Sequence, residues 1–298
     1  MSGEGTHERL LALEERLGDE RRTLLVGDRR IGLEGLDRGL AGDLDRRWGG
    51  FLEREGAADV TLRVYRSRSR GWLDPWKPGE VYRIEALGQP ATRVVASYNF
   101  ALCGDHEPGN WRVAIHEQED EPVDRLFENA VRYLVARLGV EAGGFALHAA
   151  GVLHRERAWL FAGPSRAGKS TAVGLAAPAI SLGDDFALVL PGDGEWRIPA
   201  LPFDNSERGR PDPPRGTFPL AGIWRLHKSE VTRTELPPRL LALASLMSCM
   251  AFPWALPEFS EALLDHAQRY LDQGRLGDLH FSKQADLWAV LLEERSGE

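Results

Sequence analysis

Cysteine is scarce in this sequence, since the 298 residues contain only Cys103 and Cys249. The two residues are far apart and belong to no C-x-x-C motif or cysteine–histidine cluster. This scarcity excludes a disulfide framework and a zinc site of the usual spacing. Free thiols in a reducing compartment are expected instead.

Long hydrophobic runs are also missing. No window holds about 18 consecutive apolar residues, the length that a membrane-spanning helix needs. The first twenty residues, "MSGEGTHERLLALEERLGDE", are charged throughout and lack the basic-then-apolar order of a secretory signal. We therefore expect a soluble, cytoplasmic protein with no membrane partner.

Positive charge is in deficit, because the formal net charge is −8 at pH 7. A chain of this sign lacks the global positive field that holds a nucleic-acid backbone, so nucleic acid is excluded as a partner. The one basic run, "RSRSR" at 66–70, is typical of a solvated loop or strand end. Internal repeats and low-complexity segments are absent as well.

What remains is the composition of an ordinary globular protein, with 43% hydrophobic and 28% charged residues. From residue 23 to about 117, apolar and polar residues alternate between turn residues, with one helical stretch at 36–52. The acidic, proline-ended segment 117–122 has the character of a connector. We therefore predict a β-rich α+β region over 1–122 and a separate α/β domain over 123–298.

The second region predicts a regular order of elements. An amphipathic helix at 122–144 leads into strands at 145–153 and 157–163, and a helix follows at 169–177. Further strands are expected in 179–236. Two helices, at 237–250 and 258–274, close the predicted series.

A complete G-x-x-x-x-G-K-[ST] motif lies between the strand at 157–163 and the helix at 169–177. It reads "GPSRAGKST", Gly163–Thr171. Glycines let backbone N–H groups point inward around a phosphate, and the following helix presents its positive end. The motif predicts an ATP site with Mg²⁺, in which Lys169 bridges the β- and γ-phosphates, Ser170 holds the metal and Thr171 orders the turn. The predicted nucleotide contacts are Gly163, Ser165, Arg166, Ala167, Gly168, Lys169, Ser170 and Thr171.

Two adjacent acids, Asp184 and Asp185, lie between apolar segments soon after this motif. We expect them at the end of a core strand that neighbours the loop. Beside a magnesium nucleotide, one carboxylate serves as a metal ligand and the other takes a proton from an attacking hydroxyl. Like charges this close raise one pKa unless a cation offsets them, so Mg²⁺ and Lys169 would keep both ionised. His148 lies on the preceding predicted strand, where an isolated histidine is more often a packing residue than a catalyst.

Taken together, "LHAAGV", "GPSRAGKST" and "LGDD" resemble the catalytic domain of HPr kinase/phosphorylase and related serine kinases, over about residues 125–240. The resemblance implies the P-loop fold with a mixed sheet that this family shares with ATP-dependent phosphoenolpyruvate carboxykinase. By the same resemblance, Asp184 is the general base, Asp185 binds Mg²⁺ with Ser170, and His148 lies near the transferred phosphate. The sequence leaves open which of the two aspartates is the base and which is the metal ligand.

The sequence departs from the family pattern at two places. Thr171 stands where the family has glutamate, and the segment E-x-R-G-L-G-I is missing. The corresponding interval holds only "NSERGRP" at 205–211. Glu207, Arg208 and Arg210 are therefore candidates for phosphate contacts, with a plain polar loop as the alternative. The first 120 residues do not resemble the family's regulatory domain, which puts HPr itself in doubt as a substrate.

These features predict a kinase that transfers the γ-phosphoryl group of ATP to a serine or similar hydroxyl of a peptide, protein or small molecule. Some relatives phosphorylate peptides during their maturation, and the region 1–122 would present such an acceptor by strand addition. Deleting that region without effect on peptide phosphorylation would refute the idea.

The alternative is a non-catalytic ATP-binding module that controls a partner protein. The signatures of ABC ATPases (L-S-G-G-Q) and GTPases (N-K-x-D) are absent. Relatives often form oligomers, which leaves a homo-oligomer open.

Overall fold

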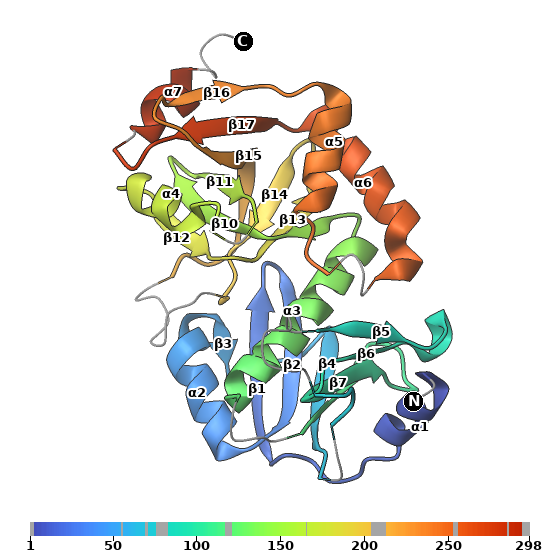
Figure 1. The fold of residues 1–298 in the computed structure, drawn as a ribbon. Coiled ribbons are helices and arrows are strands. Elements are labelled where there is room, and N and C mark those ends of the chain that lie inside the picture. Colours follow the sequence, from blue (N-terminus) through green and yellow to red (C-terminus); the bar gives the residue numbers. More distant parts are fainter. Residues whose placement is uncertain are drawn as a thin grey trace. The chain divides into compact units, whose positions relative to one another are not determined.

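The chain forms a mixed α/β protein with two mixed sheets (Figure 1). The computed structural model describes residues 3–54, 56–68, 71–75, 83–116, 121–164, 166–203, 213–252, 256–284 and 286–293. Two compact units divide the chain. The first is built mainly from Met1–Leu134 and includes Phe252–Glu258, and the second comprises Val135–Ser206, Pro211–Ala251 and Phe259–Glu298. Helix α3 (Val123–Glu141) contributes to both units.

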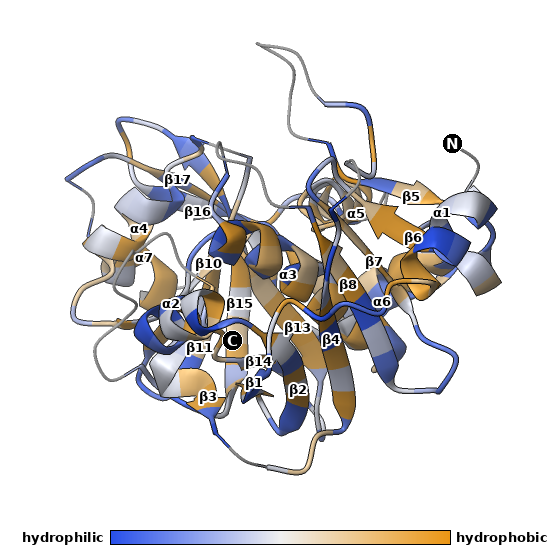
Figure 2. Ribbon diagram, turned by 90° about the horizontal axis from the view of Figure 1, so that it is seen from below, coloured by the Kyte–Doolittle hydropathy of each residue, from blue (hydrophilic) through white to orange (hydrophobic). Residues whose placement is uncertain are grey.

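The sheet of the first unit has the order β3-β1-β2-β4-β8-β7-β6-β5 in the described residues. Its strands are β1 (Glu20–Val26), β2 (Arg29–Leu36), β3 (Leu52–Glu53), β4 (Val60–Arg66), β5 (Glu85–Leu87), β6 (Val94–Ala96), β7 (Phe100–Gly104) and β8 (Asn110–Ile115). The neighbours β2–β4 and β4–β8 are parallel and the other pairs are antiparallel. Hydrophobic and hydrophilic residues alternate along strands such as β2 and β4 (Figure 2), which is the pattern that predicted strands in this region.

Two further helices cover this sheet. Helix α1 (Gly3–Leu11) packs on β5 to β8, and α2 (Arg38–Trp48) packs on β1. Asp37 caps α2 by accepting a hydrogen bond from the Leu40 N–H at 2.7 Å. The apolar spacing of Leu10, Leu13 and Leu17 predicts a helix over 7–17, but α1 ends at Leu11 because the chain then pairs with β4, where the Leu17 N–H donates to the Val64 carbonyl.

A buried ion-pair network joins α2 to the start of α3. Arg47 donates to Asp124 at 2.8 Å and to Glu128, and Glu128 also contacts Arg132 at 2.5 Å. The side chains of Arg47 and Glu128 are almost fully buried. Removing one partner of such a network leaves a buried charge without its counterion, which costs more than the intact network contributes.

We predict that Glu128→Gln lowers the free energy of unfolding by about 3 kcal/mol, because Arg47 and Arg132 then lose the buried carboxylate that they share. Urea denaturation followed by circular dichroism measures the change. The matched control is Asp43→Asn, which removes the partner of the exposed Arg46 on the same helix and should cost less than about 0.5 kcal/mol. Equal losses of unfolding free energy in both variants would contradict the stabilising role of the buried network.

The sheet of the second unit follows the path β12-β10-β11-β15-β14-β13-β9 in the described chain, with β17 beside β15 and β16 beside β17. Its strands are β9 (Phe145–Leu147), β10 (Ala149–His154), β11 (Arg157–Ala162), β12 (Ile180–Gly183), β13 (Ala187–Pro191), β14 (Trp196–Pro199), β15 (Thr217–Lys228), β16 (Arg233–Glu235) and β17 (Leu276–Phe281). Strands β11, β15 and β17 run parallel, and the other pairs are antiparallel.

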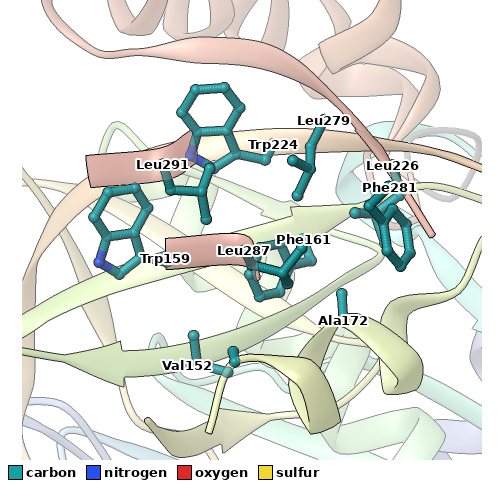
Figure 3. Close-up of a cluster of buried hydrophobic side chains, with 11 residues drawn as sticks. Val152, Trp159, Phe161, Ala172, Trp224, Leu226, Leu279, Phe281, Leu287 and Leu291 are labelled. Carbon is teal, nitrogen blue, oxygen red and sulfur yellow. The ribbon is translucent and has the colours of Figure 1, made fainter. Parts of the chain in front are cut away.

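One face of the parallel strands carries a hydrophobic core (Figure 3). It contains Trp159 and Phe161 of β11, Trp224 and Leu226 of β15, Leu279 and Phe281 of β17, and residues of α4 (Lys169–Leu175) and α7 (Leu287–Glu293). Because side chains alternate along a strand, Arg225 and Asp278 lie on the opposite face. There Arg225 donates to Ser245 of α5 (Arg239–Ser248), which packs on α6 (Ser260–Gln273).

Two stretches of this unit are each divided into two strands. The stretch 145–153 divides at His148 into β9, which pairs with β13, and β10, which pairs with β11. The stretch after 180 divides at Asp184–Asp185 into β12 and β13. Both interruptions therefore fall at residues that the sequence singles out for chemistry.

No helix in the described part of the chain is long and apolar enough to cross a membrane.

Candidate functional site

The glycine-rich motif forms a tight connection between β11 and α4, in the order strand, loop, helix that the sequence predicts. Gly163, Arg166 and Gly168 have φ angles of +156°, +65° and +107°. A Cβ on Gly163 would lie 2.8 Å from the Ala167 Cβ, and one on Gly168 would lie 3.0 Å from Phe281. Both positions therefore require glycine, because no side chain fits at the turn.

Lys169 is the first residue of α4 and has 8% of its surface exposed. Its Nζ donates to the Gly163 carbonyl at 3.0 Å and to the Pro164 carbonyl at 3.3 Å. The same atom lies 2.9 Å from Oδ1 of Asp185. An ammonium has three donors, so the loop and the carboxylate engage all of them, and a further anion binds Lys169 only by replacing one of these contacts.

Asp184 and Asp185 occupy the turn between β12 and β13. Strand β12 pairs with β10, so one strand separates the acid pair from β11. Asp185 has a left-handed φ of +62°, which is uncommon for a residue other than glycine and marks a conformation that the surroundings enforce. That backbone directs its 43%-exposed carboxylate to Lys169, while the Asp184 N–H donates to the Phe203 carbonyl at 3.1 Å.

The backbone of His148 is hydrogen-bonded to the start of the loop. Its carbonyl accepts a hydrogen bond from the Gly163 N–H at 3.5 Å, and its own N–H donates to the Cys249 carbonyl at 2.7 Å. The break between β9 and β10 is what frees these groups from the sheet ladder. His148 is half-buried, unlike the fully buried residues on either side of it.

Arg225 and Asp278 are site residues that the sequence did not reveal. In the parallel pairing, Arg225 is opposite Ala162, the last residue before the loop, and Asp278 is opposite Arg225. The guanidinium donates to both carboxylate oxygens of Asp278, at 2.7 and 2.8 Å, and to Ser245 Oγ at 2.5 Å. The arginine is therefore held in one orientation, at the same end of the parallel strands as Gly163.

The thiol of Cys249 is influenced by the charges at this end of the parallel strands. Burial raises the pKa of its thiol, while a hydrogen bond with Ser248 and the positive charges of Arg225 and Lys169 act in the opposite direction. Both cations thus influence one buried thiol. Cys249 and Cys103 are both free, as the sequence predicts, and both are buried.

Two histidines extend the ionic cluster along β15 and β17. Nε2 of His227 lies 3.2 Å from Oδ1 of Asp278, and Nε2 of His280 lies 3.6 Å from Oε2 of Glu235. The two imidazole rings are stacked, with centroids 4.8 Å apart. Burial alone would raise the pKa of Asp278, but hydrogen bonds from Arg225 and His227 hold it below its usual value.

We predict that Asp278→Asn lowers the free energy of unfolding by about 2 kcal/mol at pH 7, the scale of a hydrogen bond to a charged group. A carboxylate whose pKa falls on folding contributes stability above its unfolded pKa, and that contribution is lost as the pH falls through the folded pKa. The deficit of the variant should therefore be constant near neutrality and shrink below about pH 4. Urea unfolding at several pH values tests this, with Glu235→Gln as an exposed control that changes little. If the stability deficit of Asp278→Asn did not change with pH, the depressed pKa of Asp278 would not be its cause.

The remaining predicted residues divide into two groups. Arg166, Ser170 and Thr171 are exposed on the loop and the first turn of α4, and Ala167 is half-buried. Ser165, Glu207, Arg208 and Arg210 lie outside the described residues. Within the part of the chain that the structure describes, no group of three or more His, Cys, Asp or Glu side chains is arranged to hold a metal ion. A magnesium nucleotide needs fewer protein ligands, because phosphate oxygens and water complete the shell.

Comparisons with known proteins leave the family open. No protein-family model matches the sequence, and no curated protein matches it at a significant level. Among solved structures, the Hpr(Ser) kinase/phosphatase from Coxiella burnetii is similar over 51% of this chain and 95% of its own, with 12% identical residues and a TM-score of 0.27. This is a weak resemblance at the level of the fold, and no functional argument rests on it.

Proposed function

We propose that the second unit binds Mg²⁺–ATP at Gly163–Thr171 and transfers the γ-phosphoryl group to a serine or similar hydroxyl of a peptide, protein or small molecule. The proposal includes a P-loop domain of the type found in HPr kinase and phosphoenolpyruvate carboxykinase. One observation carries it: Lys169 and Asp185, from two separate motifs, lie 2.9 Å apart beside the glycine-rich loop.

The loop suits a nucleotide phosphate on steric and electrostatic grounds. Gly163 and Gly168 place no side chain at the turn, which lets phosphate oxygens approach the loop backbone closely. Lys169 supplies a cation at the loop, and Arg225 supplies a second at the adjoining strand end. Ser170 and Asp185 would hold Mg²⁺, which when bound neutralises phosphate charge.

The chemistry assigned to the protein is a single displacement. The acceptor oxygen forms a bond to the γ-phosphorus, the bond from that phosphorus to the β,γ-bridging oxygen breaks, and ADP leaves. Asp184 takes the proton of the acceptor hydroxyl. His148 contributes from the start of the loop, near the transferred group. Most of the rate enhancement would come from positioning and charge stabilisation.

Lys169 also distinguishes the two adjacent acids. Its ammonium lies 2.9 Å from Asp185 and forms an ion pair with that carboxylate. Asp185 is thereby committed to the cation, which leaves Asp184 as the acid available for a proton. This division agrees with the roles that the sequence resemblance implies.

The experiment is incubation of the purified chain with Mg²⁺ and ATP labelled in the γ-position, together with peptides and extract from its own host, followed by mass spectrometry of labelled products. Label on a hydroxyl of an acceptor supports the kinase. ATP labelled in the α-position is the control and should label nothing. Saturable ATP binding without any transfer would instead support a regulatory module that controls a partner protein.

A further inference from the structure

A cavity lies at the opposite end of the parallel strands from the glycine-rich loop. It has a volume of 540 Å³ and is lined by Arg157, Leu220 and Leu276 at or near the starts of β11, β15 and β17. Its size falls within the range of small-molecule sites. Five residue steps along β11 separate Arg157 from Ala162, which amounts to roughly 16 Å. The cavity is therefore distinct from the proposed nucleotide site.

One part of the cavity wall is apolar and firmly packed. It includes Trp196, Leu220, Leu236, Pro237, Leu271 and Leu276. Trp196 is 3% exposed, and its ring packs against Phe145 and Tyr270 with centroids 5.8 and 5.4 Å apart. Leu236, in contrast, is 60% exposed at the cavity. This wall suits an aromatic or aliphatic body.

The other part of the wall is cationic. Arg157, Arg239 and Arg275 line the cavity together with Glu195. Arg157 lies 3.3 Å from Glu195, and Arg239 lies 2.6 Å from Asp272. Three guanidinium groups against these two carboxylates leave one positive charge, in a chain whose net charge is −8.

Arg239 is the group best able to take a new partner. Its side chain and that of Asp272 are both more than half exposed, and exposed ion pairs of this kind contribute little. A ligand anion at the cavity gains a planar fork of donors in exchange. The cavity thus joins an apolar wall to a cation that is available for exchange.

We propose that this cavity binds a small amphipathic anion, in which a carboxylate, phosphate or sulfonate group is attached to an aromatic or aliphatic body. Arg239 and Arg157 contact the anion, and Leu236 and Trp196 contact the body. Helix α5 borders the cavity at Ala242 and holds Arg225 through Ser245. A ligand bound here therefore touches the helix that orients an arginine beside the loop.

Paired fluorescent probes test the proposal. The probe 8-anilinonaphthalene-1-sulfonate has an aromatic body and an anion, and N-phenyl-1-naphthylamine has the same body without the charge. The full chain should bind the sulfonate at one saturable site. It should bind the neutral probe at least about tenfold more weakly, because a charge-assisted contact is lost.

Four variants locate the binding. Arg239→Gln should weaken sulfonate binding about three- to tenfold, and Leu236→Glu should weaken it further by placing a carboxylate against the apolar body and adding a negative charge to the cavity. Arg233→Gln removes another exposed arginine, from β16, that does not line the cavity, and Lys169→Met alters the loop. Both should leave the affinity unchanged. Circular dichroism confirms that each variant is folded.

Three outcomes would overturn the proposal. They are equal affinity for the charged and neutral probes, full sulfonate binding by Leu236→Glu, and loss of binding in Lys169→Met. The last would place the dye at the loop. None of these results bears on phosphoryl transfer, so this proposal and the proposed kinase activity stand or fall separately.

Discussion

Asp184→Asn should reduce the rate of phosphoryl transfer by about 10²- to 10⁴-fold, the usual contribution of a positioned general base. The asparagine side chain has nearly the same shape as aspartate but does not accept a proton from the acceptor hydroxyl. Because Asp185 retains its contact with Lys169, the affinity for Mg²⁺–ATP should stay within about threefold of the wild type. Transfer of label from γ-labelled ATP and a fluorescent-nucleotide titration measure the two quantities.

The matched control for this variant is Asp193→Asn, which changes an exposed aspartate in the turn between β13 and β14. It removes the same charge from the same unit and should leave both transfer and binding unchanged. If Asp184→Asn transfers phosphate at the wild-type rate, Asp184 is not the base. If its requirement for Mg²⁺ rises instead, the roles of Asp184 and Asp185 are reversed.

Lys169→Met should weaken Mg²⁺–ATP binding at least about tenfold and reduce transfer about 10²- to 10³-fold, the effect of removing one preorganised charge. Methionine keeps much of the length of the lysine side chain and fills its buried position. The released carboxylate of Asp185 is 43% exposed, so water solvates it and the fold should persist. Label transfer and circular dichroism on the same preparation check both statements.

Lys228→Met is the control for the lysine variant. Lys228 is the last residue of β15 and is exposed, so its loss changes the net charge equally without touching the loop. We expect wild-type binding and transfer. A variant at Lys169 that binds and transfers normally would show that the loop does not hold the nucleotide.

Local patterns predicted the elements that carry the motifs. The strand before Gly163 and the helix after Gly168 follow from a short apolar run, two glycines and a helix-forming segment, all within twenty residues. The long helix α3 and the helices α5 and α6 follow from apolar spacing in the same way. These features depend on neighbours in the sequence, which is why periodicity reveals them.

Features that depend on distant parts of the chain were not predicted. Arg225 and Asp278 are 53 residues apart and meet only because β15 and β17 pair in one parallel register. Strand β17 and helix α7 were themselves not predicted. The left-handed turn at Asp185 and the break at His148 depend on packing against Lys169 and Cys249, and neither contact leaves a signature in the surrounding residues.

The most direct test of the proposed site is a calorimetric titration of the wild-type chain with Mg²⁺–ATP. We expect one site per chain with a dissociation constant between micromolar and millimolar, that is, a binding free energy of about −4 to −8 kcal/mol. The absence of saturable binding at millimolar nucleotide would contradict the account, because the contact between Lys169 and Asp185 would then belong to a loop that holds no phosphate.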